Sequence, residues 1–206
     1  MPDTILEIVQ YLNENGELPF EYSGDNWVYD AFCERQKRRG IYNSQYLTPD
    51  ATVDRMLHFA GKYFKDNNVC DACCGTGQIT KELLKDGYNV TAFDIDYEMV
   101  ELCNILYSSL IVHQNDFRDM EGCYNQIISN PPYETPVLTE FLQWIDSVQH
   151  VGGTSILLVP LGFVFKNKPK KLVETLHKFS IVETEPMREN FERTNCKAEI
   201  VVLRKL

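Results

Sequence analysis

The sequence predicts an α/β protein with a mostly parallel seven-stranded sheet, helices on both faces and an antiparallel hairpin at the C-terminal end. Three observations predict this class. From residue 49 onward, helical patterns alternate with short apolar runs, the order typical of parallel sheets. A glycine-rich turn follows the first of these runs, as in open sheets that bind a ligand at their edge. The last two runs, at 179–186 and 197–204, are typical of an antiparallel pair.

Residues 1–45 are predicted to form a helical N-terminal extension, and residues 46–206 the main domain. The first helix covers 4–14, where apolar residues recur at helical spacing, and Gly16 and Pro19 close it. This helix is expected to pack against the rest of the molecule.

A second helix is predicted over 25–39, with four side chains facing inward: Trp27, Val28, Phe32 and Cys33. It ends in a basic cluster at 35–39, just before Gly40. Cations at a helix C-terminus interact favourably with the helix dipole, so the cluster is interpreted as a solvated helix end. Contact with nucleic acid is the alternative for these residues.

The main domain is expected to contain helices at 49–64, 78–86, 97–106, 134–149 and 168–178. Its strands are expected at 69–73, 88–93, 109–113, 124–129, 153–159, 179–186 and 197–204.

The composition fits a single globular domain of 206 residues, with 44% hydrophobic and 24% charged residues. The net charge is -10, made up of +4 in residues 151–206 and -14 in residues 1–150. An acidic body binds a phosphate backbone poorly by itself. No apolar stretch approaches the roughly 20 residues that span a bilayer, and the N-terminus does not resemble a signal peptide. We therefore expect a cytoplasmic protein that does not bind membranes.

The seven cysteines are odd in number and irregularly spaced, which favours reduced thiols over a disulfide framework. Cys70 and Cys73 form a C-x-x-C pair, but no second Cys or His pair lies at zinc-site spacing. No metal site is expected.

A cofactor site is predicted where the first strand runs into the turn Gly75-Thr76-Gly77. Glycines let the backbone turn tightly and approach a ligand. Asp94 ends the next strand, 19 residues after Gly75, where a carboxylate can accept hydrogen bonds from both hydroxyls of a ribose. These residues indicate a cofactor that contains adenosine. Thr80 stands where the dinucleotide fingerprint has its third glycine, which disfavours hydride transfer.

A rigid turn at Asn130-Pro131-Pro132-Tyr133 follows a buried strand and predicts the catalytic site. Two prolines stiffen the chain and supply no N–H groups, so backbone carbonyls and the Asn130 side chain are left as acceptors. Acceptors at Asn130 Oδ1 and the Pro131 carbonyl can hold the hydrogens of a planar amino group and favour its attack. Tyr133 offers a flat face for stacking the acceptor.

These motifs resemble those of the amino-group DNA methyltransferases, in particular the N6-adenine enzymes of the gamma motif order, over about residues 42–206. The segment 71–77 is similar to that family's cofactor motif, and 130–133 matches its catalytic tetrapeptide. The segment 45–49, Gln-Tyr-Leu-Thr-Pro, looks like the family's Tyr-x-Thr-Pro segment. The resemblance implies a Rossmann-like fold that uses S-adenosylmethionine (SAM).

The resemblance also implies which residues bind SAM: Tyr46, Thr48, Pro49, Asp71, Cys73, Gly75, Gly77, Asp94, Ile95, Asp116 and Phe117. In this scheme Asp116 accepts from the adenine amino group, Phe117 lies against the ring, and Asp71 lies near the methionine ammonium. Asp116 and Asp119 have an alternative interpretation as helix caps. Phe163 and Phe165 lie where the family often places a second aromatic against a flipped base, and the sequence does not choose between them.

The acceptor expected from the resemblance is adenine in DNA or RNA. Flipping a base out of a duplex costs a few kcal/mol, and the basic clusters here are modest. The relatives usually carry a separate target-recognition domain, so a recognition subunit or a single-stranded acceptor is expected. Two alternatives remain: a methyltransferase for a protein glutamine amide, which shares Asn-Pro-Pro-Tyr, and a non-catalytic SAM-binding partner.

Overall fold

The computed structural model describes residues 5–17, 28, 31, 32, 35, 46–107, 110–165, 169–187 and 196–206. Its helices are α1 (Ile5–Asn15), α3 (Asp50–Tyr63), α4 (Gln78–Lys85), α5 (Tyr97–Leu106), the short 3₁₀ helix η2 (Phe117–Asp119), α6 (Thr135–Val148) and α7 (Lys170–Leu176). Its strands are β1 (Asn68–Ala72), β2 (Asn89–Asp94), β3 (Val112–Gln114), β4 (Tyr124–Ser129), β5 (Gln149–Pro160), β6 (Phe179–Pro186) and β7 (Ala198–Lys205).

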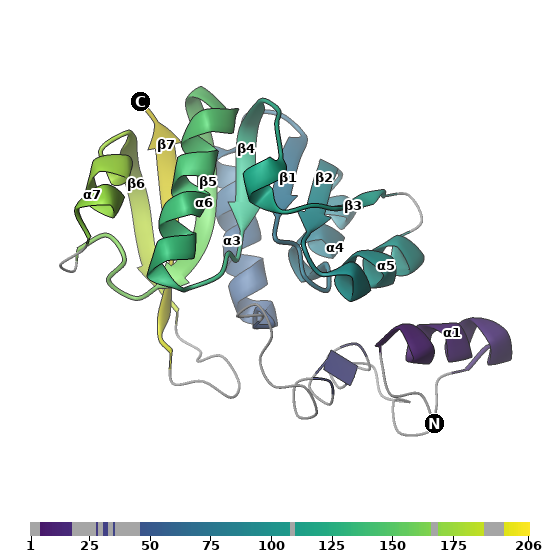
Figure 1. The fold of residues 1–206 in the computed structure, drawn as a ribbon. Helices are drawn as coiled ribbons and strands as arrows, with labels where there is room; N and C mark the ends of the chain where they lie inside the picture. The colour runs from purple at the N-terminus through teal and green to yellow at the C-terminus, as the bar shows by residue number, and fades with distance from the viewer. Residues whose placement is uncertain are drawn as a thin grey trace.

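The strands form one seven-stranded sheet in the order β3-β2-β1-β4-β5-β7-β6 (Figure 1). The first five strands are parallel, and β7 runs antiparallel between β5 and β6. The chain steps outward from β1 to β3 and then returns to place β4 on the other side of β1. This reversal creates a crevice at the carboxyl ends of β1 and β4, where open sheets bind their ligands. The predicted fold class is confirmed.

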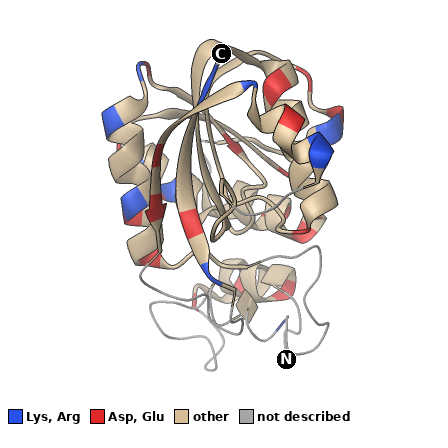
Figure 2. Cartoon of the chain, turned by 90° about the vertical axis from the view of Figure 1, so that its left-hand side faces the viewer, with Lys and Arg blue, Asp and Glu red and all other residues tan. Residues whose placement is uncertain are grey.

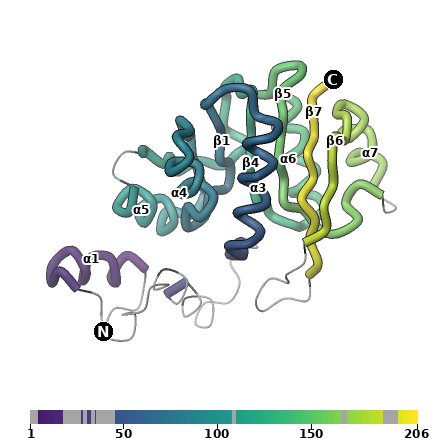
Figure 3. The backbone as a smooth tube through the Cα atoms, turned by 180° about the vertical axis from the view of Figure 1, so that it is seen from behind, coloured from purple at the N-terminus to yellow at the C-terminus, as the bar shows by residue number. Residues whose placement is uncertain are grey.

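Helices cover both faces of the sheet. Helices α6 and α7 lie over the face nearest the viewer in Figure 1, and α3, α4 and α5 lie over the opposite face, which Figure 3 shows from behind. Alternation along β2 divides its side chains between the two sides. Phe93 packs against Trp144 of α6, with ring centroids 5.7 Å apart. Its neighbour Ala92 packs on the other face, against Val100 and Cys103 of α5.

The predicted strand boundaries needed correction at two places. β3 begins at Val112 rather than at residue 109, because the Asn104 side chain of α5 accepts a hydrogen bond from Val112 N at 2.8 Å just where pairing with β2 begins. β5 begins at Gln149, directly after α6, rather than at residue 153. Gly152 adopts φ 82° in this early part of β5. The register between β5 and β4 shifts in the same part of the strand.

The N-terminal extension packs on α5. Ile5, Ile8 and Val9 of α1 form an apolar cluster with Met99 and Leu102 of α5. Figure 1 shows α1 below α5, beside the carboxyl edge of the parallel strands. The inward orientation predicted for the first helix is therefore confirmed.

Four residues of the predicted helix at 25–39 are described, and all four have helical backbone: Val28, Ala31, Phe32 and Arg35. Phe32 is buried, as predicted. Trp27, Cys33 and residues 36–40 lie outside the described residues. The interpretation of the basic cluster as solvated is wrong for Arg35, which is buried and binds the carboxylates of Asp96 and Glu98 at the N-terminal end of α5.

Two further findings concern only the described residues. No helix among them combines the length and the apolar character that crossing a bilayer requires. The cysteines of the described ranges are free thiols: Cys70, Cys73, Cys74, Cys103, Cys123 and Cys196. Cys33 is not described.

Candidate functional site

A cavity of about 380 Å³ lies at the carboxyl ends of β1, β2 and β4. This volume falls in the range of sites that hold small molecules and cofactors. Most of the predicted cofactor and catalytic residues line it: Tyr46, Thr48, Cys73, Gly75, Asp94, Ile95, Asp116, Phe117, Asn130 and Pro132. The remaining predicted residues do not form its wall: Pro49, Asp71, Gly77, Pro131, Tyr133, Phe163 and Phe165. The structure thus brings five separate segments of the chain to one place.

The glycine loop between β1 and α4 follows a path that favours glycine. Gly75 and Gly77 have φ angles of 55° and 77°, values that side chains with a Cβ seldom adopt. A Cβ on Gly77 would lie 2.6 Å from Cε2 of Tyr107. Gly77 therefore lets the loop pack closely on α5, although it does not line the cavity. Cys73 shares the left-handed conformation with φ 59°, which the sequence did not reveal.

Asp94 connects the glycine loop to the start of α5. Its carboxylate accepts from Gly75 N at 2.8 Å and from Asp96 N at 2.9 Å. A carboxylate offers about four lone-pair positions, so acceptor capacity is left for a ligand hydroxyl. Burial is the main cause that raises the pKa of Asp94 to about 6. The two backbone N–H donors oppose that rise, because they favour the ionised form.

Asp71 lies near the end of β1, just before the glycine loop in the chain, with 0% of its surface exposed. The Thr80 hydroxyl donates to Asp71 Oδ2 at 2.5 Å, and Oδ1 has no hydrogen-bond partner among the described residues. Burial raises the pKa of Asp71 to about 7. A buried carboxylate with an open acceptor position suits the cationic end of a ligand. Thr80, which the sequence marked only as a missing glycine, supplies the hydroxyl that holds it.

Asp116 is both a helix cap and a cavity residue. Its side chain accepts from Arg118 N at 2.9 Å at the start of η2, as the alternative interpretation expected. The Arg118 guanidinium also binds Asp116 Oδ2 at 2.8 Å and Glu140 at 2.8 Å, and its carbon lies 4.6 Å from the centroid of the Phe117 ring. Arg118 lines the cavity and was not predicted, because a single arginine two residues after an aspartate forms no recognisable motif. Asp119 does not line the cavity.

Asn130 is held in one orientation by the segment before α3. Its Nδ2 donates to Tyr46 O at 3.2 Å and to Thr48 Oγ1 at 3.1 Å. The backbone N–H of Thr48 in turn donates to Gln78 Oε1 of α4 at 3.0 Å. Because both hydrogens of the amide are used, Asn130 Oδ1 remains as an acceptor for a ligand. Gln78, like Arg118, was missed at the level of sequence.

The predicted aromatic residues differ strongly in exposure. Tyr133 packs against Tyr46, with ring centroids 6.4 Å apart, and burial raises the pKa of its phenol well above the usual range. Phe163 is 4% exposed and belongs to the core beneath α6, whereas Phe165 is 77% exposed. Of the two phenylalanines, only Phe165 is exposed, and neither lines the cavity.

Metal ions require sets of ligands from several side chains. The described residues contain no cluster of three or more His, Cys, Asp or Glu side chains arranged to hold an ion. The carboxylates at the cavity bind backbone N–H groups, a hydroxyl or a guanidinium instead.

Comparisons with known proteins point to methyl transfer. Residues 69–153 match the methyltransferase domain family. The type II methyltransferase M.VspI from Vibrio sp. (strain 343) is 28% identical over 142 residues, which cover 62% of this chain and 33% of that protein. The chain thus spans about a third of the length of this relative.

Two solved structures share the fold at low sequence identity. A Listeria monocytogenes protein assigned to the class I SAM-dependent methyltransferases has a TM-score of 0.68 and 17% identity, covering 98% of this chain and 68% of its own. Magnesium protoporphyrin IX methyltransferase from Synechocystis, solved with bound SAM, has a TM-score of 0.63 and 19% identity, covering 100% and 98%. Together with the matched domain, these findings support a SAM-dependent methyltransferase whose cofactor is SAM.

The cavity fits SAM in its chemistry as well as its size. The carboxylates of Asp94 and Asp116 and the ring of Phe117 line it. Asp71 near the end of β1 has an open oxygen but does not form the wall. A ribose, an adenine and an ammonium group require acceptors and apolar surface of this kind.

SAM binding is expected to strengthen as the pH rises from about 5 to about 8, by up to about tenfold per pH unit where a carboxylate must lose its proton first. The reason is that the pKa values of Asp71 and Asp94 are raised to about 7 and about 6, while a cationic ligand prefers the ionised forms. In the absence of SAM, the stability of the folded protein changes with pH in the opposite direction to SAM binding. The folded state holds a proton that the unfolded state has released, so stability falls as the pH rises from about 4 toward the folded pKa.

Calorimetric titration of SAM across this pH range tests the prediction, with Asp71→Asn as the comparison. The variant has no proton to release at this position, so its pH dependence should be shallower and its affinity above pH 7 lower. An equally steep dependence in Asp71→Asn would exclude Asp71 as the titrating group.

Proposed function

We propose that this protein transfers the methyl group of SAM to the exocyclic N6 amino group of adenine in DNA or RNA. The observation that carries the proposal is the fixed orientation of Asn130, whose amide donates to Tyr46 O and Thr48 Oγ1 and so leaves its oxygen for an acceptor amine. Asn130 and Pro132 line the same cavity as Gly75 and Asp94. This shared lining supports an acceptor site next to the cofactor site.

The chemistry of an aromatic amine explains why this arrangement suits it. The nitrogen lone pair is delocalised into the ring, which makes the amine a poor nucleophile. Acceptors at Asn130 Oδ1 and the Pro131 carbonyl hold its two hydrogens and favour a pyramidal nitrogen with its lone pair free. SAM supplies an electrophilic methyl group on its sulfonium. The methyl passes from sulfur to nitrogen, the nitrogen loses one proton, and no strong general base is required.

Thr48 gives the Tyr-x-Thr-Pro segment a further role in this scheme. An asparagine amide that is free to rotate would present its NH₂ group to the amine half of the time, and two donors would then face each other. Bonds to the Tyr46 carbonyl and the Thr48 hydroxyl remove that alternative. The same segment is bound to α4 through Gln78. We infer that it couples the cofactor loop to the catalytic asparagine.

The stacking surface for the target base is assigned to Tyr133 and Phe165. Aromatic stacking on a nucleobase contributes about 1–3 kcal/mol. Phe165 follows β5 and exposes 77% of its surface, whereas Phe163 is fully engaged in the core. Tyr133 is the last residue of the proline turn and lies against Tyr46. We therefore propose Phe165 as the second aromatic and exclude Phe163 from direct contact.

Recognition of the target sequence is proposed to require a further subunit or segment. M.VspI is named as a type II methyltransferase, and this chain spans a third of it. The net charge is -10. Figure 2 shows Lys and Arg interspersed with Asp and Glu on the helices flanking the sheet, rather than gathered into one basic face in that view. Binding to phosphates is strong only where cations are concentrated.

The proposal is tested by incubating the protein with SAM labelled in its methyl group and, in parallel, with DNA, RNA and protein fractions. Label is expected at adenine N6 in a nucleic acid, identified by digestion to nucleosides. Label confined to a glutamine amide would replace the proposal with the protein-methyltransferase alternative. Absence of label from every fraction, despite SAM binding, would favour a non-catalytic partner.

A further inference from the structure

We infer that the N-terminal extension completes the cofactor site, with Phe32 in its wall against the adenosine half of SAM and Arg35 positioning that wall through Asp96 and Glu98. Phe32 lines the cavity together with Asp94 and Ile95. Phe32 and Arg35 both precede residue 42, where the resemblance to the amino-group methyltransferases begins. The inference concerns the cofactor alone, so it is independent of the acceptor.

One helical face carries the residues involved. Val28, Ala31, Phe32 and Arg35 have helical backbone and stand at positions i, i+3, i+4 and i+7, which lie on the same side of a helix. Ala31 and Phe32 are buried, and Arg35 is only 8% exposed. A face that buries an arginine beside apolar residues requires a partner for its charge.

The apolar part of this face packs between α1, α5 and the segment before α3. Ala31 and Phe32 share a cluster with Met99 and Leu102 of α5, and Leu47 packs against the same cluster. Leu47 lies between Tyr46 and Thr48, which line the cavity. Phe32 is thereby held beside the ribose end of the site, between α5 and the segment that orients Asn130.

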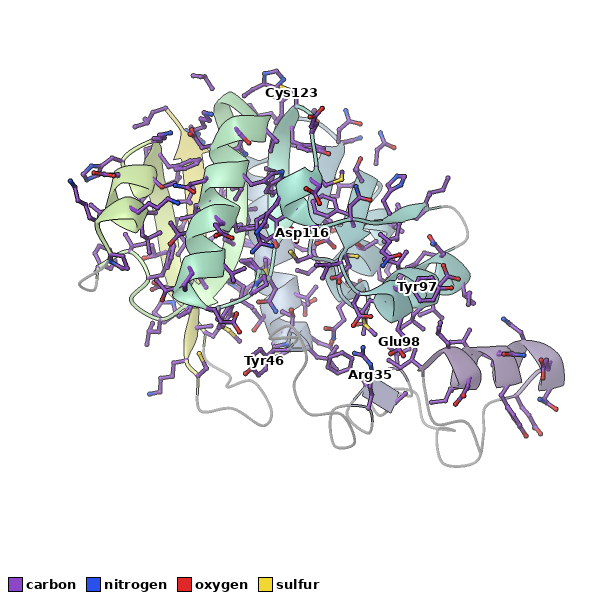
Figure 4. The ribbon with its side chains drawn as sticks, viewed as in Figure 1. Arg35, Tyr46, Tyr97, Glu98, Asp116 and Cys123 are labelled. Atoms are coloured by element: carbon purple, nitrogen blue, oxygen red, sulfur yellow. The ribbon has the colours of Figure 1, made fainter. Side chains whose placement is uncertain are left out.

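Arg35 supplies the polar part of the contact. Its Nη2 lies 2.7 Å from Asp96 Oδ2, and its Nε lies 2.6 Å from Glu98 Oε2. Figure 4 shows Arg35 just below Glu98, at the carboxyl edge of the sheet. A guanidinium that binds two carboxylates through separate nitrogens has a fixed position, which an ammonium cannot reproduce.

Asp96 links this ion pair to the ribose acceptor. Its Oδ1 accepts from Glu98 N as the cap of α5, and its own N–H donates to Asp94 Oδ1 at 2.9 Å. Asp94, Asp96 and Glu98 place three carboxylates at the N-terminus of α5. The helix dipole stabilises negative charge there, and Arg35 offsets the mutual repulsion. Loss of Arg35 would leave two carboxylates without that cation and disturb the backbone that holds Asp94.

SAM affinity measured by calorimetry on the full chain tests the inference. Phe32→Ala and Arg35→Ala are each expected to raise the dissociation constant about tenfold, from lost contact in the first case and lost positioning in the second. The affinity for 5′-methylthioadenosine, which lacks the amino-acid part of SAM, should fall by the same factor in both variants, because the contacts lie on the adenosine half. The matched control is Arg55→Ala, which breaks an arginine–carboxylate pair with Glu185 away from the cavity and should bind SAM as the original chain does.

Two further variants separate positioning from general stability. Val9→Ala removes methyl groups from the same apolar cluster without touching the cavity, so it should lower the unfolding temperature and leave SAM affinity unchanged. Arg35→Lys keeps the charge and should lower the affinity for SAM less than Arg35→Ala does. The inference is overturned if Phe32→Ala and Arg35→Ala bind SAM normally, or if Val9→Ala weakens SAM as much as they do. If Arg35→Ala fails to fold, the SAM affinities of Phe32→Leu and Arg35→Lys test the inference in its place: weakened binding supports it and normal binding overturns it.

Discussion

Replacing Asn130 by alanine is expected to lower the turnover number about a thousandfold while the SAM dissociation constant changes less than about twofold. The substitution removes the oxygen that is proposed to accept a hydrogen from the acceptor amine. That bond matters most in the transition state, where the nitrogen becomes pyramidal and gains positive charge. Loss of a contact that strengthens only there lowers kcat and kcat/KM together. The measurement is transfer of labelled methyl to the acceptor found in the fraction screen, with SAM binding followed by calorimetry.

Two further substitutions serve as comparisons for Asn130→Ala. Asn125→Ala, on the strand β4 that leads to Asn130 but with its amide bound to Asp66 away from the cavity, should retain normal turnover. Thr48→Val removes one of the two acceptors that orient the Asn130 amide, and an intermediate loss of kcat is expected. If Asn130→Ala instead abolishes SAM binding and keeps the rate of bound enzyme, Asn130 belongs to the cofactor site and not to the acceptor site.

Replacing Asp94 by alanine is expected to have the opposite effect, raising the SAM dissociation constant about a hundredfold with a smaller change in the rate at saturation. Hydrogen bonds to a charged group contribute about 1.5–3 kcal/mol each, and about 1.4 kcal/mol corresponds to a factor of ten. Asp94 is proposed to bind the ribose hydroxyls, and it also holds Gly75 N and Asp96 N. The variant therefore loses ligand contacts, one bond to the glycine loop and one bond to the start of α5.

Calorimetry with SAM on Asp94→Ala, Asp94→Asn and Asp119→Ala gives the comparison. Asp94→Asn keeps one acceptor oxygen and should lower the affinity for SAM less than Asp94→Ala does. Asp119 lies outside the cavity, so Asp119→Ala should bind SAM normally. Normal SAM affinity in Asp94→Ala would contradict the ribose assignment and leave Asp94 as a purely structural link between the loop and α5.

The sequence predicted best where neighbouring residues in the chain carry the signal. The alternation of helices and strands, the glycine loop and the proline turn are all local, and each appears in the structure within a few residues of its expected place. Asp94 and Asn130 were placed at strand ends by the same local patterns. Boundaries shifted where a distant group intervened, as at β3, where Asn104 of α5 binds Val112.

Predictions were weakest where a residue's role depends on its partner. Arg35 belongs to a basic run that looks solvated, yet it pairs with two carboxylates more than sixty residues away. Arg118, Gln78 and Thr80 have no distinctive neighbours in sequence, although each binds a predicted site residue or its segment. Their roles become visible only when the carboxyl edges of several strands are brought together.

The sequence by itself determined the fold class, the order of the elements and the set of polar residues at the strand ends, because helix and strand periods and turn chemistry depend on residues close in the chain. Only the tertiary structure decided that Asn130 is oriented by Tyr46 and Thr48, that Phe165 rather than Phe163 is exposed, and that the extension reaches the cofactor cavity. Burial and hydrogen-bond partners are set by how distant elements pack. No pattern along the chain encodes that packing directly.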